Sequence, residues 1–204
     1  MDLLLLTTLV AVGAFILKSI DQRRRIALLS SHLGQYQIEK LMESLTQGYL
    51  RCLGEDDAQR RLQIWQIWQL LATSEQSLSE QFNRFAAEFA EVDAAQTRVS
   101  TLPIGLPMAD KLFASATFDV RKAFQIHARG IAELSANRLQ QTPKARAFTL
   151  SAELFLMQHT CHWFCRSKAV ASARMMLTHK TSYTLLLDSV SPATRKAYRD
   201  LTGI

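Results

Sequence analysis

The start of the chain constrains its fold more than any other stretch, because the fifteen residues from Leu3 to Leu17 carry no charge. A helix of this length is about 23 Å long, and adding residues 1, 2 and 18–20 lengthens it to about 30 Å, the thickness of a bilayer's hydrocarbon core. Ten of the fifteen are Leu, Ile, Phe or Val, and each of these favours insertion by about 0.3–0.6 kcal/mol. The run therefore predicts one transmembrane helix, with the Lys18 side chain reaching the headgroups.

The charges around this run predict its orientation. No Lys or Arg precedes it, whereas Lys18 and Arg23–Arg25 follow it. The positive-inside rule places Met1 outside and the chain beyond residue 18 in the cytoplasm. A cleavable signal peptide is one alternative, but it needs a basic start and small residues after the run, where this chain has Asp2 and KSIDQ. A soluble helix is the other alternative, because the run is short. We expect residues 1–25 to form a membrane anchor with a basic cytoplasmic flank.

The remainder has the composition and periodicity of an all-α protein. Seven glycines and four prolines in 204 residues are few for a chain of turns and strands, and apolar residues recur at steps of three and four. We expect an antiparallel bundle of about five to seven helices after the anchor. The predicted helices span about residues 36–53, 56–72, 77–92, 108–140 and 143–177, and a short helix follows Ser191-Pro192. Residues 183–190 fit a helix or an extended segment.

Two of the predicted helix starts depend on local motifs. Ser77-Leu78-Ser79-Glu80 matches a capping box, and Thr142-Pro143 matches an N-cap followed by proline at the first helical position. The break at Ser30–Gly34 is expected to end the first helix.

Charge and proline divide the chain into two halves. Residues 1–98 hold 10 basic and 12 acidic residues, whereas residues 99–204 hold 14 and 6. Pro103, Gly105 and Pro107 interrupt helical periodicity at the point where the charge balance changes. We expect a slightly acidic helical half at 26–98, a linker at 99–107 and a basic helical half at 108–204.

The basic half predicts contact with an anionic surface. Arg166, Lys168, Arg174 and Lys196 are candidate anion-binding residues. Anionic lipid is favoured over nucleic acid, because lipid is the nearest polyanion to a tethered domain and no compact basic reading helix is evident. The alternative is a solvated helical face.

Trp65 and Trp68 lie three residues apart in the predicted helix 56–72, where they could form a recognition face for a partner. The favoured alternative is that both are packed in the core or at the membrane interface.

One stretch has the residue types of a metal or redox site. His159, Cys161, His162 and Cys165 fall within seven residues, and a helix could present two of them to one ion readily and three with strain. The alternative, which we favour, is that both cysteines are small buried hydrophobes. His127 lies on an apolar helix face and is expected to be a hydrogen-bonded core residue.

The pattern as a whole favours binding over catalysis. The sequence holds no phosphate-cradling glycine loop, nucleophile elbow or CxxC pair. We expect no cofactor, and we expect a single-pass, cytoplasm-facing adaptor that holds a protein partner or a second copy of itself at the inner membrane. Anionic lipid or nucleic-acid binding is the first alternative, and a metal or redox site at His159–Cys165 is the second.

Overall fold

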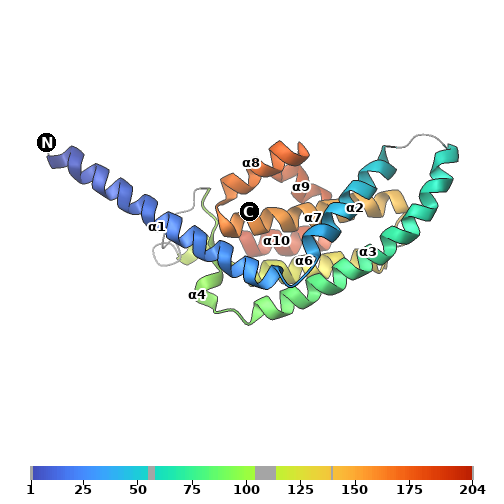
Figure 1. Ribbon diagram of the computed structural model, residues 1–204, viewed down its shortest axis with the longest axis horizontal. Coiled ribbons are helices and arrows are strands. Elements are labelled where there is room, and N and C mark those ends of the chain that lie inside the picture. The colour runs from blue at the N-terminus through green and yellow to red at the C-terminus, as the bar shows by residue number, and fades with distance from the viewer. Residues whose placement is uncertain (1, 55–57, 104–113, 139, 204) are drawn as a thin grey trace.

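The structure, a computed structural model, describes residues 2–54, 58–103, 114–138 and 140–203. Of the described residues, 82% are helical, and they form nine α-helices, which confirms the all-α fold with a long apolar N-terminal helix. Figure 1 shows α1 projecting from one end of an elongated helical bundle. The helices are α1 (Asp2–Leu33), α2 (Ile38–Leu53), α3 (Ala58–Ala90), α4 (Ala94–Thr97), α6 (Val120–Ser135), α7 (Pro143–Cys165), α8 (Lys168–His179), α9 (Tyr183–Ser189) and α10 (Pro192–Thr202).

Helix α1 is continuous from the apolar run into the bundle. Its last two turns lie against α7 and α3, with Leu29 buried and Leu33 packed on the core. The expected break begins later than predicted, at Gly34. Ser31 Oγ donates to the Leu28 carbonyl at 2.8 Å, and the His32 ring bonds the same carbonyl at 2.9 Å. Both side chains therefore bond within the helix, and packing of Leu29 and Leu33 on the core keeps residues 30–33 helical.

Helix α3 is also continuous, so the predicted new start at Ser77 is wrong. The capping-box residues lie inside the helix, where Ser77 Oγ accepts a hydrogen bond from the Gln81 amide at 3.1 Å. The buried stripe crosses this polar stretch without a change of period; its members are Leu71, Leu78, Phe82, Phe85 and Phe89. Packing of this stripe therefore outweighs the local capping signal.

A small β-ribbon replaces part of the predicted linker and helix. Strands β1 (Arg98–Ser100) and β2 (Thr117–Asp119) pair antiparallel, with Val99 opposite Phe118. The helix expected from residue 108 is wrong for 114–119, which form a 3₁₀ turn, Ala114–Ala116, and then β2. Residues 104–113, which hold the last four residues of the predicted linker and the predicted start of the next helix, lie outside the described residues.

Asp119 explains why α6 begins where it does. Its carboxylate accepts from the Arg121 N–H at 3.0 Å, which caps the helix. The Arg121 guanidinium pairs with the same carboxylate at 2.7 Å and donates to the carbonyls of Ala90 and Val92. Because those carbonyls end α3, Arg121 fixes the start of α6 against the end of α3.

Helix α7 is the central element, because its own buried residues lie on all sides of the helix. Its predicted start is confirmed, with the Thr142 hydroxyl capping the helix and Pro143 in the first turn. It does not continue to residue 177, because the chain turns at Arg166 and Ser167 caps the separate helix α8. Residues 183–189 are helical, and α10 starts after Ser191 and ends at Gly203, as expected.

Aromatic rings from both halves of the chain meet in one core. Phe85 and Phe89 on α3 each lie 5.2 Å from Phe124 on α6, centroid to centroid, in T-shaped geometry. Phe89 also contacts Phe164 on α7 at 6.1 Å. Offset and T-shaped pairs of this kind add about 0.5–1.5 kcal/mol each beyond burial.

Candidate functional site

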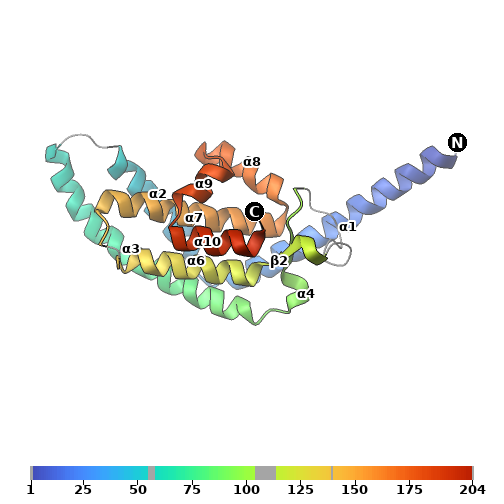
Figure 2. The ribbon, with the colours of Figure 1, turned by 180° about the vertical axis from the view of Figure 1, so that it is seen from behind.

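The apolar part of α1 extends away from the bundle, as Figures 1 and 2 show. Leu3 is 76% exposed, Phe15 72% and Ile20 59%. Among the described residues, α1 is the one helix that is long and apolar enough to span a membrane, and none of its apolar window is buried. A continuous exposed apolar surface of this size is typical of a membrane or protein contact site.

Basic residues that are distant in sequence gather where α1 enters the bundle. Arg25 pairs with Asp21 at 2.8 Å, donates to the Arg98 carbonyl at 3.0 Å and stacks over the Phe164 ring at 5.5 Å. Arg166 donates to the Gln22 side chain at 2.7 Å. We call Arg23–Arg25, Arg98, Arg166 and Arg174 the basic collar.

Three arginines of the collar affect the pKa of the Cys165 thiol. Burial raises the pKa of Cys165 to about 11, and Arg166, Arg25 and Arg174 each oppose the rise through their charge. Three guanidinium groups from α1, the turn after α7 and α8 therefore lie within electrostatic range of one side chain. Two of these guanidinium groups, on Arg166 and Arg174, belong to exposed side chains and are therefore not part of buried ion pairs.

The four predicted anion-binding residues do not form one site. Arg166 and Arg174 belong to the collar. The Lys168 ammonium lies over the rings of Trp163 and Tyr183, at 5.4 and 4.9 Å, and burial lowers its pKa. Lys196 is exposed on α10, which packs against α6.

Trp65 and Trp68 fall in the first part of α3, where the side chains lie outside the described residues, so their predicted partner or core role stays a prediction.

The two histidines of the His159–Cys165 stretch have different environments. His159 is buried, its Nε2 lies 3.1 Å from Ser172 Oγ, and its ring contacts Tyr183 at 4.7 Å. Burial lowers its pKa to about 3. His162 is partly exposed, with Nδ1 3.4 Å from the Arg174 guanidinium, and burial together with Arg174 lowers its pKa.

The two cysteines of this stretch are free thiols packed against the core. Burial raises the pKa of Cys161 even further than that of Cys165, which opposes formation of the thiolate that binds metals. Within the described residues, no three His, Cys, Asp or Glu side chains converge as metal ligands.

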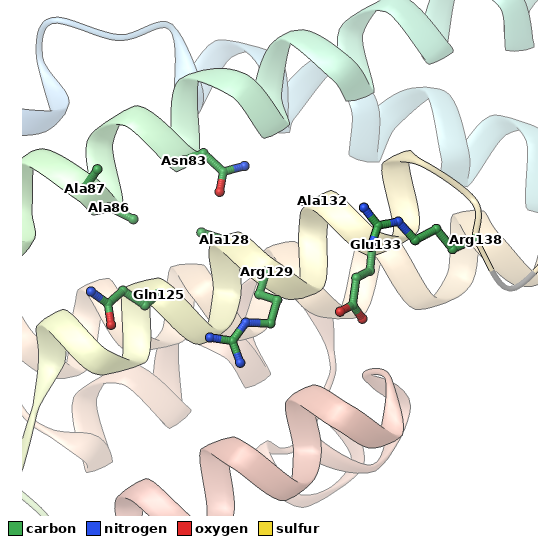
Figure 3. Close-up of a pocket in the computed structure, with 9 residues that line it drawn as sticks. All are labelled: Asn83, Ala86, Ala87, Gln125, Ala128, Arg129, Ala132, Glu133 and Arg138. Carbon is green, nitrogen blue, oxygen red and sulfur yellow. The ribbon is translucent and has the colours of Figure 1, made fainter.

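An open groove of about 430 Å³ runs between α3 and α6. In Figure 3, small side chains of the two helices face each other across it, and longer polar side chains extend along its rim. Its lining residues are Asn83, Ala86, Ala87, Gln125, Ala128, Arg129, Ala132, Glu133 and Arg138. Alanines on both helices leave space between the backbones, and a volume of this size can hold a side chain or short segment of another molecule.

Two buried carboxylates were not identified from the sequence. Glu75 on α3 accepts from the Tyr49 hydroxyl at 2.5 Å and pairs with Arg146 at 3.2 Å. Glu153 on α7 accepts from the Ser191 N–H at 3.1 Å, and its Oε2 is buried without a hydrogen-bond partner among the described residues. A signal for Glu153 was present, because it is the one acidic residue between Pro143 and Cys165.

A chain of buried hydrogen bonds joins α6, α7 and α10. His127 is fully buried and bonds the Thr160 hydroxyl at 2.8 Å, and Thr160 bonds the Tyr198 hydroxyl at 2.8 Å. Burial lowers the pKa of His127 to about 3, so the imidazole is neutral. The prediction of a hydrogen-bonded core histidine is confirmed.

Comparisons with known proteins give no relative: no family model matches this chain, and neither does any curated protein or solved structure.

Proposed function

We propose that this protein is a single-pass membrane protein, with Met1 outside, whose helical bundle acts in the cytoplasm as an interaction module at the inner membrane. The observation that carries this proposal is the continuity of α1. Its exposed apolar part has the length and composition of a spanning helix, and its last turns are packed into the bundle. The bundle is therefore tethered without a flexible linker.

The basic collar supports the proposed orientation. Positive residues near the end of a spanning helix favour the cytoplasmic side. The fold adds Arg98 and Arg166 to the Arg23–Arg25 cluster of α1, since Arg25 contacts the Arg98 backbone and Arg166 contacts Gln22.

The groove between α3 and α6 supports a binding role. The alanines that line it leave room for another chain to approach the two helices closely. Its charged lining residues have both signs, with Arg129 and Arg138 positive and Glu133 negative. Interfaces typically surround an apolar centre with a polar rim of this kind. Glu153, His127 and His159, whose pKa values are all strongly shifted, are buried in the bundle, where a substrate would reach them only by unpacking it.

Extraction of the full chain from its host membranes tests the anchor. We expect the protein to resist alkaline carbonate, and Leu9→Lys/Val12→Lys to release it, because each charge at the centre of a spanning helix costs about 3 kcal/mol. Leu50→Lys is the matched control, since Leu50 is 65% exposed on α2. Release of the unmodified chain by carbonate would refute the anchor, and removal of a C-terminal epitope by external protease on intact cells would refute the orientation.

Site-specific photo-cross-linking tests the interaction role. A benzophenone amino acid at Ala87, in the groove, is expected to give a discrete protein adduct, either with another chain or with a second copy. The same substitution at Ala193, exposed on α10, is the control. Arg129→Glu should abolish the Ala87 adduct without changing the circular dichroism spectrum. No adduct at Ala87, or the same adducts at both positions, would refute a groove-mediated interaction.

A further inference from the structure

Helix α8 presents apolar residues outward as well as inward. Ala171 and Met175 are buried against the bundle. On the opposite side Val170 is 40% exposed, Met176 47% and Leu177 74%, and Ala169 and Ala173 are exposed between them. The outer face of α8, which comprises these five residues, is thus apolar along the length of the helix. An exposed apolar face of this kind is typical of a site that contacts a membrane or another protein.

The edges of this face carry positive charge and no negative charge. Lys168, Arg174 and Lys180 lie on or directly after α8, and Arg166 precedes it, whereas residues 154–187 contain no Asp or Glu. An apolar face bordered by Lys and Arg is the composition of helices that lie in the headgroup region of a membrane. The charge is complementary to anionic phospholipids and not to a neutral surface.

The fold places α8 next to the end of the anchor. Arg166 Nη1 lies 2.7 Å from the Gln22 side chain of α1. Gln22 is two residues beyond Ile20, about 3 Å further along the helix axis. In both ribbon views α8 lies on the side of the bundle toward which the free end of α1 extends. A spanning segment that ends near Ile20 therefore brings the start of α8 to headgroup depth.

We propose that the outer face of α8 rests in the headgroup region of the bilayer that α1 spans, and that Arg166, Arg174 and Lys180 bind anionic phospholipid headgroups there. This inference rests on the proposed membrane anchoring. Guanidinium groups form paired hydrogen bonds with phosphate oxygens, and Val170 and Leu177 enter the interface between them. The basic collar on α1 provides further positive charge at the same depth.

The test uses the full chain in phospholipid vesicles with a benzophenone amino acid at one of three positions. Leu177 tests α8 and Leu9 tests the anchor. Leu50 is the water-facing control, because it is exposed near the C-terminal end of α2, and that end of α2 lies far from the free end of α1 (Figure 1). The vesicles contain phosphatidylcholine alone or mixed with phosphatidylglycerol, and mass spectrometry identifies the adducts. We expect lipid adducts at residues 9 and 177, none at residue 50, and preferential labelling of phosphatidylglycerol at residue 177.

Arg174→Glu should lower the phosphatidylglycerol adduct at residue 177 by about fivefold or more, since one basic residue near an anionic surface contributes about that factor. Arg174→Lys should retain the adduct, and Lys196→Glu, a charge reversal on α10, should leave it unchanged. Lipid adducts at residue 9 with none at residue 177 would overturn this inference and leave the anchor intact. Absence of lipid adducts at residue 9 would overturn the anchor as well. Equal labelling of both lipids, or a protein or nucleic-acid adduct at residue 177, would also overturn the inference.

Discussion

Among the described residues two carboxylates are buried, and their surroundings stabilise them in different ways. Glu75 lies where α2, α3 and α7 meet and has a cation, Arg146, and a hydroxyl donor, Tyr49. Glu153 lies where α6, α7 and α10 meet and accepts a hydrogen bond from the Ser191 N–H, with no cation paired to it among the described residues. Burial raises the pKa of both carboxyls; for Glu153 the value reaches about 7.

The comparison shows that burial of an acidic residue does not by itself fix its charge. Burial has the largest effect on the pKa of Glu75, and the Tyr49 hydrogen bond and then the Arg146 charge lower that pKa against it. At Glu153 the neutral donors Thr194 and Ser191 oppose burial, but Glu133 adds to it. The first region depends on an ion pair, and the second is most stable when its acid is protonated.

Removal of the cation should have the largest effect. Arg146→Ala leaves Glu75, whose side chain is 2% exposed, without its ion-pair partner, and we expect a loss of about 3–5 kcal/mol in unfolding free energy. Chemical denaturation of the full chain in detergent micelles measures this. Arg199→Ala is the control, because its pair with Asp188 is about half exposed and should contribute less than about 1 kcal/mol. Equal losses in the two variants would contradict the assigned role of Arg146.

Neutralisation of Glu153 should have an effect that depends on pH. A folded pKa of about 7 against 4.5 unfolded means that the native state binds more protons between these values, so its stability falls as pH rises through this window. Glu153→Gln removes that loss. We expect the variant to match the parent near pH 4.5 and to gain up to about 3 kcal/mol above pH 7.

Denaturation midpoints of Glu153→Gln and the parent across this pH range measure the difference. His127 and His159 have folded pKa values of about 3, and their opposite pH dependence is common to both proteins and cancels. A difference that is constant with pH would show that Glu153 has the same pKa in the folded and unfolded states, and so that burial does not raise it.

The two tyrosines should differ by a smaller amount. Tyr49→Phe removes a hydrogen bond to a carboxylate, with an expected cost of about 2 kcal/mol, whereas Tyr198→Phe removes a bond between neutral hydroxyls, with an expected cost of about 1 kcal/mol. Thermal melts of both variants test the order. A larger loss for Tyr198→Phe than for Tyr49→Phe would contradict the importance of charge-assisted hydrogen bonds around Glu75.

The smallest effect is expected at Gly130. A Cβ at this position would lie 2.9 Å from Glu153 Oε2 and even closer to Thr194 Oγ1. Gly130→Ala should cost about 1–3 kcal/mol through crowding and regain about 1 kcal/mol through helix propensity, for a net loss of about 1 kcal/mol. The same measurement at high and low pH sharpens the comparison, because crowding of an ionised carboxylate should increase the loss above pH 7. A stabilised variant would show that α10 can move away from α6.

The sequence predicted the parts of the fold that depend on local signals. Each of these signals is contained in one short stretch of sequence: the apolar run of α1, the Thr142-Pro143 start of α7 and the Ser191-Pro192 start of α10. The β-ribbon was missed because strands of three residues are too short for periodicity to identify. The end of α7 at Cys165 was missed because the Ser167 cap is a single residue without a proline or glycine beside it.

The ion pair and the collar could not be predicted, because both join residues that are distant in sequence. Glu75 and Arg146 are 71 residues apart, Arg25 and Arg98 are 73 apart, and Gln22 and Arg166 are 144 apart. Composition identified a basic second half, but only the fold distinguishes Arg166, which lies beside α1, from Lys196, which lies on α10. The same holds for the outer face of α8, which the pattern of residues 143–177 had merged with α7.

The unbroken helix between the apolar run and the bundle has a mechanical consequence under the membrane anchoring proposed above. A spanning helix tilts to match its apolar length to the thickness of the bilayer. Because α1 is a single helix of 32 residues whose end is packed into the bundle, any such tilt turns the bundle with it as a lever. The far end of α3 would sweep a wider arc than α8, so a change in membrane thickness would be converted into a displacement of the surface farthest from the membrane.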